Sequence, residues 1–558
     1  MKKIFTGAVI VLISFVQLLA APVPDWLRSA VIYHIYPSSY CDSDGDGIGD
    51  LEGIRSKLDY IKSVGFNTIW MSPCFKSEFE DGGYDITDFY QVDPRFGTNQ
   101  QLVDLIKDAH AKDMRVCLDL VAGHTSDKHP WFVQSCDPDT SSHYSDYFIW
   151  NNDSTELPSK KFVKAGAKRN GNYLCNFFEI QPALNYGYAN PDPTQPWQQG
   201  VDAPGPRAVR QEIKNIMGFW MSKGVDGFRC DLAPSLIKGD DKNFSANKKL
   251  WQEFRQWIDD NHPGCIIISE WSQPANAIEA GFHIDLIIHN KWGNDMYRPL
   301  FCQTSDKGEP TPCFFDKNGQ GAVDRFVKRY SQQITATDGK GYGSMPTCSH
   351  DIWRLNRLGR STQAELKTAM TFFFTMPWIP IVYYGEEIGM RNIEDAPYKE
   401  GSKTARNRSG CRTPMQWDST LNAGFSSAAA EDIYLPIDPD PSRPTVAAQL
   451  NDPKSLLNYV RGLVALRNEY PALGTEGSWT YLSSLEQPYP MIFMRQLGEE
   501  RFIVAINPSG KTVSSTFDAP ADKAVAIYGT ELSNRYKVRG GKATIVMKPI
   551  SATIFRLD

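Results

Sequence analysis

The 558-residue sequence lacks the features that mark several special classes of protein. Its 59 Lys and Arg against 65 Asp and Glu give a formal net charge of −6, and no dense stripe of basic residues interrupts this balance. Such a chain is a poor candidate for binding nucleic-acid backbones, so we expect no nucleic-acid partner. The sequence also contains no CxxC pair or Cys/His spacing typical of zinc sites, and no internal repeat or low-complexity tract.

What is present is the composition of a folded protein. Hydrophobic residues make up 41 % of the chain and charged residues 22 %, which excludes a disordered, collagen-like or coiled-coil protein. The length exceeds what one hydrophobic core usually serves, so we expect two or more domains. The sequence does not settle the oligomeric state, and a monomer or weak oligomer is the working expectation.

The N-terminal segment has the pattern of a routing signal. A short positive start, Met1-Lys2-Lys3, precedes an apolar run from Ile4 to Leu19 and the small residues Ala20 and Ala21. This is typical of a secretory signal peptide, here residues 1–21. The run is short for a membrane anchor, and no later segment resembles one. We therefore expect an exported protein, periplasmic or extracellular, with no membrane association after cleavage.

Eleven cysteines remain after this segment, an odd number for a disulfide framework. A chain of this size does not need such a framework to fold. A disulfide between Cys302 and Cys313, or between Cys136 and Cys175, is an open alternative to free thiols.

Short apolar strands alternate with helical patterns along most of the chain. Eight buried strands separated by helices predict an α/β fold, a (β/α)₈ TIM barrel with parallel strands. The predicted strands are Val31 to Tyr36, Asn67 to Ser72, Arg115 to Leu120, Gly227 to Asp231, Cys265 to Glu270, Phe282 to Ile288, Met345 to His350 and Ile379 to Tyr384.

Two interruptions of this pattern predict further domains. About a hundred residues separate the third strand from the fourth, far more than a barrel unit requires, so residues 123–207 are expected to form a small inserted domain. After residue 474 short strands with turn signals follow, such as Met491 to Arg495 and Ser551 to Leu557, and they predict an antiparallel C-terminal β-sandwich over 475–558. The barrel then comprises residues 22–122 and 208–474.

Acidic residues close three of the predicted barrel strands. Asp231, Glu270 and Asp351 stand at the ends of the fourth, fifth and seventh strands, which meet at one face of a barrel. Carboxylates gathered there repel one another, so at least one should keep its proton as a general acid needs. Arg229 lies on the same face of its strand as Asp231 and can hold that residue ionised. This is the arrangement required to cleave a glycosidic bond through a covalent intermediate.

An acidic, glycine-rich loop follows the first strand. In residues 42–50, carboxylates at Asp42, Asp44, Asp46 and Asp50 alternate with other residues, which indicates an oxygen cage for a hard cation. The EF-hand pattern does not apply, because its twelfth position is Gly53 rather than Glu. A solvated acidic turn is the alternative.

Seven short motifs, in order along the chain, carry a resemblance to a known family. They span nearly all of the sequence after residue 21. Four are similar to the signature regions of the α-amylase family of glycoside hydrolases, and three resemble its oligo-1,6-glucosidase and α-glucosidase branch. The four are residues 119–124 (DLVAGH), 227–231 (GFRCD), 270–271 (EW) and 349–351 (SHD); the three are 181–185 (QPALN), 383–390 (YYGEEIGM) and 412–418 (RTPMQWD).

The resemblance implies a role for each catalytic residue. It makes Asp231 the nucleophile and Glu270 the general acid/base, and it gives Asp351 the binding of sugar hydroxyls that helps distort the ring toward the oxocarbenium state. Arg229 would hold Asp231 ionised and oriented.

Further residues are implied to bind the substrate, an oligosaccharide. His124 and His350 would donate hydrogen bonds to the sugar in the first subsite, and Tyr84 would form a stacking floor beneath it. Asp81 and Arg412 would hold the hydroxyls of the terminal sugar and close the pocket behind one unit, which favours attack at chain ends. In similar glucosidases the acidic loop holds a structural Ca²⁺ through Asp42, Asp44, Asp46, Asp50 and the carbonyl of Ile48.

The chain departs from the family pattern at four positions. Gly123 and Ser349 stand where Asn is usual, and Ala183 replaces an Asp. Leu232, after the nucleophile, is neither the Val that accompanies α-1,6 preference nor the Thr that accompanies α-1,4. Leu is apolar like Val, so we lean toward α-1,6, and the linkage stays open.

These features together predict a secreted, retaining, exo-acting α-glucosidase that hydrolyses isomalto- or malto-oligosaccharides. The alternatives are a transglucosidase or isomerase, like a trehalose synthase or sucrose isomerase, and an endo-acting α-amylase. The Arg-Leu-Asp-Arg-Asp run associated with sucrose isomerases is absent between Glu270 and His350. A non-catalytic binding protein is disfavoured, because all three carboxylates are present.

Overall fold

A computed structural model describes residues 23–152, 155, 157–164, 169–288, 295–305, 307–401 and 407–558. The predicted signal peptide, residues 1–21, lies outside the described residues. Within them, no helix has the length and apolar character needed to cross a membrane.

Eight parallel strands form the centre of the molecule, in the order β12-β11-β10-β9-β5-β2-β1-β13. The outermost strands meet through a bridge between Pro346 and Ile381 and a 2.9 Å hydrogen bond from the Thr347 amide to the Ile381 carbonyl, so the sheet is nearly closed into a barrel. This confirms the predicted (β/α)₈ fold. The strands are β1 (Ile32–Ile35), β2 (Thr68–Met71), β5 (Arg115–Leu120), β9 (Gly227–Cys230), β10 (Ile266–Glu270), β11 (Ile284–Leu286), β12 (Tyr342–Ser344) and β13 (Ile381–Tyr383).

The seventh barrel strand lies earlier than the sequence pattern predicts. We expected Met345 to His350, whereas β12 ends at Ser344. Pro346 has no amide hydrogen and cannot continue the ladder, so the apolar residues after it form an irregular segment. The buried residues of that segment, such as Cys348 and His350, produce the strand-like pattern.

Helices surround the barrel and bury one stripe each against it. Capping boxes begin two of them: Thr98 precedes α3 and pairs with Gln101 in its first turn, and Thr362 precedes α10 and pairs with Glu365 in the same way. The helices of the barrel are α1 (Leu51–Ser56), α2 (Leu58–Val64), α3 (Asn99–His110), α5 (Pro204–Met221), α6 (Ser245–Asn261), α7 (Pro274–Glu279), α8 (Tyr297–Phe301), α9 (Asp324–Thr337), α10 (Gln363–Thr375), α11 (Val446–Leu450) and α12 (Leu456–Glu469).

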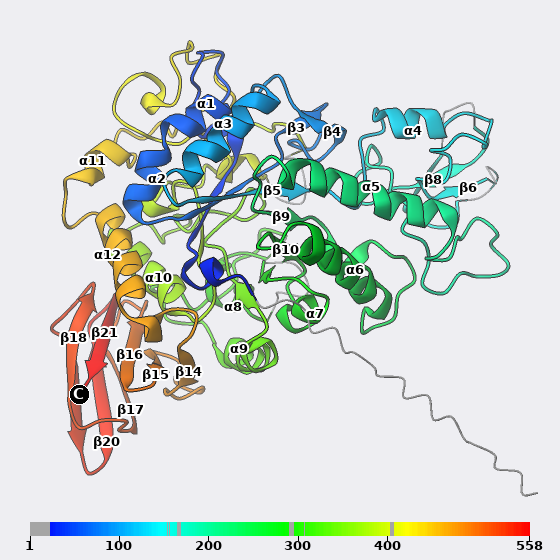
Figure 1. The fold of residues 1–558 in the computed structure, drawn as a ribbon. Helices are drawn as coiled ribbons and strands as arrows, with labels where there is room; N and C mark the ends of the chain where they lie inside the picture. Colours follow the sequence, from blue (N-terminus) through cyan, green and yellow to red (C-terminus); the bar gives the residue numbers. More distant parts are fainter. Residues whose placement is uncertain are drawn as a thin grey trace, which may run out of the picture.

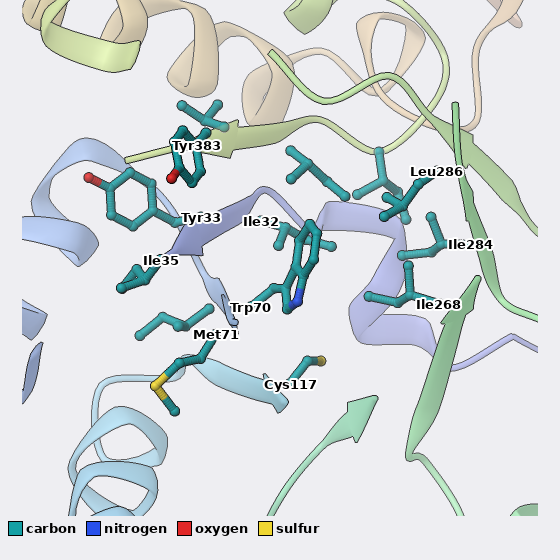
Figure 2. Close-up of a cluster of buried hydrophobic side chains, with 14 of the residues drawn as sticks. Ile32, Tyr33, Ile35, Trp70, Met71, Cys117, Ile268, Ile284, Leu286 and Tyr383 are labelled. Carbon is teal, nitrogen blue, oxygen red and sulfur yellow. The ribbon is translucent and has the colours of Figure 1, made fainter. Parts of the chain in front are cut away.

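The barrel interior is filled by side chains of its own strands. Figure 2 shows buried residues of β1, β2, β10 and β11 gathered around Trp70. Trp70 stacks on His34 with ring centroids 3.6 Å apart. Because side chains fill the interior of the barrel, a substrate can bind only outside it, and in such barrels the site lies at the carboxyl ends of the strands.

A small domain is inserted after β5, as the long gap in the pattern predicts. It contains α4 (Pro130–Ser135) and a three-stranded sheet of β6 (Trp150–Asn151), β7 (Phe162–Lys164) and β8 (Asn172–Leu174). Helix α5 begins at Pro204, four residues before the expected barrel boundary at residue 208. An antiparallel hairpin, β3 (Phe75–Ser77) and β4 (Ile86–Val92), was not predicted, and its connecting loop carries Asp81 and Tyr84.

The C-terminal region forms two antiparallel sheets packed face to face, which confirms the predicted sandwich. Their shared core includes Ile503, Phe517, Ile545 and Phe555. Figure 1 shows this domain beside α10 and α12, on the side of the barrel away from the insert. The sheets are β14-β15-β16-β21-β18 and β17-β20-β19, with β14 (Ser478–Tyr481), β15 (Met491–Leu497), β16 (Glu500–Asn507), β17 (Val513–Asp518), β18 (Ala524–Gly529), β19 (Arg535–Arg539), β20 (Lys542–Met547) and β21 (Ser551–Leu557).

Two buried arginines lie at the junction of the sandwich and the barrel, and one of them, Arg495, donates across it. Arg495 of β15 donates to the carbonyls of Thr375, Leu473, Gly474 and Gly477 among others. Arg467 of α12 donates to four carbonyls in the same region, those of Phe374, Met376, Leu473 and Trp378. Both use backbone carbonyls instead of a carboxylate, and burial lowers the pKa of Arg495 to about 9 and that of Arg467 to about 10.

No disulfide joins the cysteines of the chain, all eleven of which lie in the described residues. The two pairings considered from the sequence, Cys302 with Cys313 and Cys136 with Cys175, are not formed.

Candidate active site

Arg229 organises the carboxylates at the ends of the central strands. Its Nη1 lies 2.9 Å from Asp231 Oδ1 and 2.7 Å from Asp119 Oδ1, and its Nη2 lies 2.8 Å from Glu270 Oε2. Strands β9 and β10 are adjacent and parallel, which places Asp231 and Glu270 side by side at their carboxyl ends. The sequence prediction that Asp231, Glu270 and Arg229 meet agrees with this geometry.

Three carboxylates around one guanidinium cannot all be neutralised by it. Burial raises the pKa of Asp231 well above its usual range, Arg229 opposes this, and Glu270 and Asp119 add to it. Crowding of carboxylates at this position therefore favours the protonated form of a carboxyl group there. One protonated and one ionised carboxyl group is the state that acid-assisted attack on an acetal carbon requires.

Asp119 was quoted in a motif but not assigned to the site. Besides Arg229 it accepts 3.1 Å hydrogen bonds from the Tyr84 hydroxyl and from Trp70 Nε1. A carboxylate within the apolar run of β5 is the signal that could have revealed it, because a buried charge requires partners.

Asp351 lies in a more positive environment than Asp231. Its Oδ1 is 2.6 Å from Arg408 Nη1 and 3.3 Å from Arg412 Nη2, and its Oδ2 is 3.3 Å from His350 Nε2. Burial alone would raise the pKa of Asp351, but His350, Arg408 and Arg412 outweigh it and hold the pKa well below its usual range. Asp351 is thus an ionised hydrogen-bond acceptor rather than an acid.

Arg408 is a site residue that sequence reasoning missed. Its Nη2 lies 2.7 Å from Asp81 Oδ1, so its guanidinium bridges Asp81 and Asp351. The other oxygen of Asp81 accepts a 2.8 Å hydrogen bond from Gln181 of the inserted domain. We expected Arg412 to pair with Asp81, but Arg412 binds Asp351 and the His350 carbonyl instead.

The predicted sugar-binding rings cluster beside these charges. Tyr84 stacks on His350 with centroids 5.1 Å apart. His124 is buried, which lowers its pKa to about 4 and keeps the ring neutral. Its Nε2 lies 3.1 Å from the Tyr84 carbonyl and must carry the hydrogen, so Nδ1 is the acceptor that faces the Asn176 amide at 3.5 Å.

Asn176 occupies the space that Gly123 leaves open. A Cβ atom at position 123 would lie 2.9 Å from Asn176 Nδ2, and this amide donates to the Gly123 carbonyl at 2.6 Å. The Asn176 side chain also accepts from Lys238 Nζ at 3.1 Å. The departure at position 123 is therefore matched by a polar side chain from the inserted domain.

A cavity opens between the barrel and the insert and reaches Leu232, the residue after Asp231. Its volume is about 550 Å³, and Leu232, Asn176, Phe177, Tyr188 and Lys238 are among the residues that line it. Leu232 adopts a left-handed backbone conformation at φ 48°, and its amide donates to Glu270 Oε2 at 3.2 Å. The residue after Asp231 thus contacts Glu270 and faces this cavity.

The acidic loop brings three of its predicted ligands together. One carboxylate oxygen each of Asp42, Asp44 and Asp50 lies within 4.8 Å of the others, a spacing suited to one oxygen-ligated cation. Asp46 lies outside this group and accepts from the Ile48 amide at 2.8 Å. Partial burial, and then repulsion from neighbouring acids, raise the pKa of Asp46. The donor set therefore fits a hard cation such as Ca²⁺.

Carboxylates and arginines at the carboxyl ends of the strands of a (β/α)₈ barrel define a barrel glycoside hydrolase. Residues 34–476 match the family described as alpha amylase, catalytic domain. The chain belongs to this α-amylase family.

Its relatives include enzymes with different activities. An oligo-1,6-glucosidase of Heyndrickxia coagulans is 29 % identical, over 96 % of this chain and all of that protein. A trehalose synthase/amylase of Mycolicibacterium smegmatis is 30 % identical, over 86 % of this chain and 82 % of that protein. Among solved structures, an isomaltulose synthase mutant from Erwinia rhapontici in complex with sucrose has a TM-score of 0.78 and 25 % identity, over 96 % and 100 % of the two chains.

Proposed function

We propose that the protein is an exported, retaining, exo-acting α-glucosidase that releases glucose from short isomalto- or malto-oligosaccharides. The observation that carries this proposal is the position of Asp231 and Glu270, which lie side by side at the ends of adjacent strands and share the guanidinium of Arg229. Export rests on the signal-peptide pattern of residues 1–21.

The chemistry follows from two carboxyl groups with different protonation. Ionised Asp231 attacks the anomeric carbon while Glu270 donates its proton to the departing glycosidic oxygen. The C–O bond breaks and a covalent glucosyl ester forms on Asp231. Glu270, now ionised, takes a proton from a water molecule that attacks the same carbon, and Asp231 leaves. Two inversions give net retention.

Attack at chain ends is supported by the charges around Asp81. Asp81 is 5 % exposed, and Arg408 and Gln181 hold it between the barrel and the insert. Arg408 and its two carboxylate partners, Asp81 and Asp351, would place hydrogen-bonding groups beside the sugar that is cleaved off. These groups suit the free hydroxyls of a terminal glucose and obstruct a glucan chain that continues past it.

We further propose that the acidic loop binds a structural Ca²⁺ through Asp42, Asp44 and Asp50, joined by Asp46 and the Ile48 carbonyl. Ser426 donates to Asp42 Oδ2 at 2.5 Å, and the Tyr434 amide donates to the Gly47 carbonyl at 2.8 Å. A cation there would fasten the loop after β1 to residues nearly 400 positions later.

Transfer of glucose to a sugar is the second candidate function. It is supported by relatives named trehalose synthase/amylase and by the named isomaltulose synthase structure. In both candidates the intermediate is the same, and the difference lies in what attacks it. The cavity beside Leu232 is where an acceptor sugar or a water molecule would enter.

Product analysis on isomaltose, maltose, trehalose, sucrose and soluble starch tests both candidates. Glucose release from the short substrates, with isomaltose cleaved faster than maltose, is the expected outcome. Rapid thinning of starch with long products contradicts exo-action. Rearranged disaccharides without net glucose favour the transferase. Proton NMR of the first product tests retention, because a retaining enzyme releases α-glucose.

A further inference from the structure

Asp285 is a fully buried carboxylic acid on β11, beside the end of the strand that carries Glu270. In the parallel pairing of β10 and β11, Ser269 lies opposite Asp285 and Glu270 lies opposite Leu286. An Asp in the apolar run of a barrel strand is unusual, since a buried carboxylate requires strong partners. The partners of Asp285 show what it does.

One oxygen of Asp285 holds the backbone that surrounds Glu270. Its Oδ1 accepts hydrogen bonds from Ser269 Oγ at 2.6 Å, the Trp271 amide at 3.0 Å and the Ser272 amide at 3.3 Å. These donors belong to the residues immediately before and after Glu270. Ser272 has φ 63°, a conformation that costs a serine free energy and needs such support.

Burying a carboxyl group at position 285 lowers the stability of the fold. Burial raises its pKa to about 7 against the opposing effect of its hydrogen bonds, and its Oδ2 has no hydrogen-bond partner in the described structure. An apolar side chain of similar volume would avoid both costs. Groups that lower stability while holding a reactive segment are typical of functional sites.

Glu270 is thus held at its carboxylate and at the backbone on either side of it. Arg229 Nη2 and the Leu232 amide bind its carboxylate, at 2.8 and 3.2 Å. Asp285 holds the backbone amides of Trp271 and Ser272, which follow Glu270. Small displacements of a catalytic group cost large factors in rate, so support of this kind acts on the reaction through Glu270.

We propose that Asp285 is a positioning residue that holds the turn after β10, so that the carboxyl group of Glu270 stays aimed at the glycosidic oxygen. This inference rests on the proposed role of Glu270 as acid/base. The need for a proton grows as the leaving group becomes poorer. A misplaced acid therefore harms disaccharide cleavage more than cleavage of α-glucosyl fluoride, whose leaving group needs little protonation.

The test compares kcat/KM for isomaltose, maltose and α-glucosyl fluoride in the full-length enzyme, since this ratio reports the step that forms the glucosyl ester. We expect Asp285→Ala to lose at least about tenfold more activity on the disaccharides than on the fluoride. Asp285→Asn keeps one acceptor oxygen but not the carboxylate charge, so it should reduce that difference to about threefold. Equal losses on all three substrates overturn the proposal.

Two further variants separate this inference from the function on which it rests. Glu270→Gln must show the same dependence on the leaving group; if it does not, the role of Glu270 itself is wrong. Asp226→Ala is the matched control, because Asp226 accepts from the Val116 amide at the opposite end of the barrel. It should affect all substrates alike. If Asp285→Ala does not fold, Asp285→Asn decides: a disaccharide-specific loss of about threefold supports the proposal, and no such difference overturns it.

Discussion

Arg229 contacts three carboxylates through two nitrogens, so its single positive charge is divided among Asp119, Asp231 and Glu270. Asp351 instead forms ion pairs with Arg408 and Arg412. The two positions therefore differ in their charge environment, which raises the pKa of Asp231 and lowers that of Asp351. This difference supports the proposed roles, proton transfer within the Asp231–Glu270 pair and hydrogen-bond acceptance by Asp351.

Replacing the proposed nucleophile tests this assignment directly. Asp231→Asn should lower kcat/KM by a factor of at least about 10³, because an amide cannot form the glucosyl ester. The same substitution at Asp226, which is buried at the other end of the strand, is the control for folding. Mass spectrometry of the enzyme treated with a slow fluorosugar should place the label on Asp231. A label on another carboxylate would show that the nucleophile is misassigned.

The pairing of Gly123 with Asn176 gives a second prediction at this scale. Gly123→Ala should lower stability and activity together, since its Cβ would lie 2.9 Å from the Asn176 amide that faces His124. We expect a cost of about 1–3 kcal/mol in the free energy of unfolding, measured by urea denaturation. Adding Asn176→Gly to Gly123→Ala should restore stability but not the full kcat. Stability unchanged by Gly123→Ala would contradict the close contact.

At the residue scale the sequence predicted the acids better than their partners. Asp231 and Glu270 stand at the carboxyl ends of β9 and β10, and the strand pattern itself brings them together, whereas Asp351 follows an irregular buried segment after β12. Arg408 lies in a loop beyond β13, and only the folded course of that loop takes it to Asp81. Asp285 could be suspected as a charge in an apolar run, but its hydrogen bonds to the turn after Glu270 depend on the register of β10 and β11.

The elements of the barrel were predictable wherever a strand is buried on both faces, because such strands are continuous apolar runs. β12 was misplaced because burial continues from Met345 to His350, whereas the continuous strand ends at Ser344 and only an isolated bridge at Pro346 follows. The β3–β4 hairpin was missed because β3 has only three residues and β4 carries polar residues among its apolar ones. The insert was recognised from a gap in the repeat, which gives its extent but not its strands.

Arg408 joins Asp81 of the β3–β4 loop to Asp351, which follows β12. Removing Arg408 tests how much this bridge contributes to stability and to substrate binding. Arg408→Ala should cost about 3 kcal/mol in the free energy of unfolding if Asp81, which is buried, and Asp351, which is partly buried, remain charged. It should also lower kcat/KM on isomaltose by about 10²-fold. Arg408→Lys keeps the charge but cannot span both carboxylates, so it should recover stability more than activity. A variant with unaltered isomaltose kinetics would exclude this bridge from substrate binding.

Calcium binding is a prediction for the whole molecule, because the acidic loop contacts segments far along the chain. Chelation should lower the melting temperature, and a hundredfold excess of Ca²⁺ over its dissociation constant should restore about 2.7 kcal/mol. Asp44→Ala should abolish this dependence, because Asp44 is one of the three converging ligands and is exposed to solvent. Asp25→Ala, which removes an exposed acid elsewhere, should not. An equal melting temperature with and without Ca²⁺ would refute the site.

Stability should also depend on pH through buried acids remote from the catalytic pair. Burial raises the pKa of Glu386 to about 7, while Arg354 opposes it. The unfolded chain then binds fewer protons than the folded one between about pH 4.5 and 7, so the stabilisation is complete below this window and is lost as pH rises through it. The contribution changes by at most about 1.4 kcal/mol per pH unit. Glu386→Gln should make the midpoint of urea unfolding depend less on pH across this range. The same pH dependence in the variant and in the unaltered protein would show that Glu386 is not the group that titrates.

The arginines at the junction of barrel and sandwich bear on how the protein comes apart. Arg495 belongs to the sandwich, yet it donates to carbonyls at the end of α10 and in the segment after α12. Separation of the two domains would take the guanidinium of Arg495 away from those barrel carbonyls and leave them without this donor. The sandwich and barrel should therefore melt in a single calorimetric transition, and a protease that cuts near residue 475 should inactivate the enzyme rather than release a working barrel.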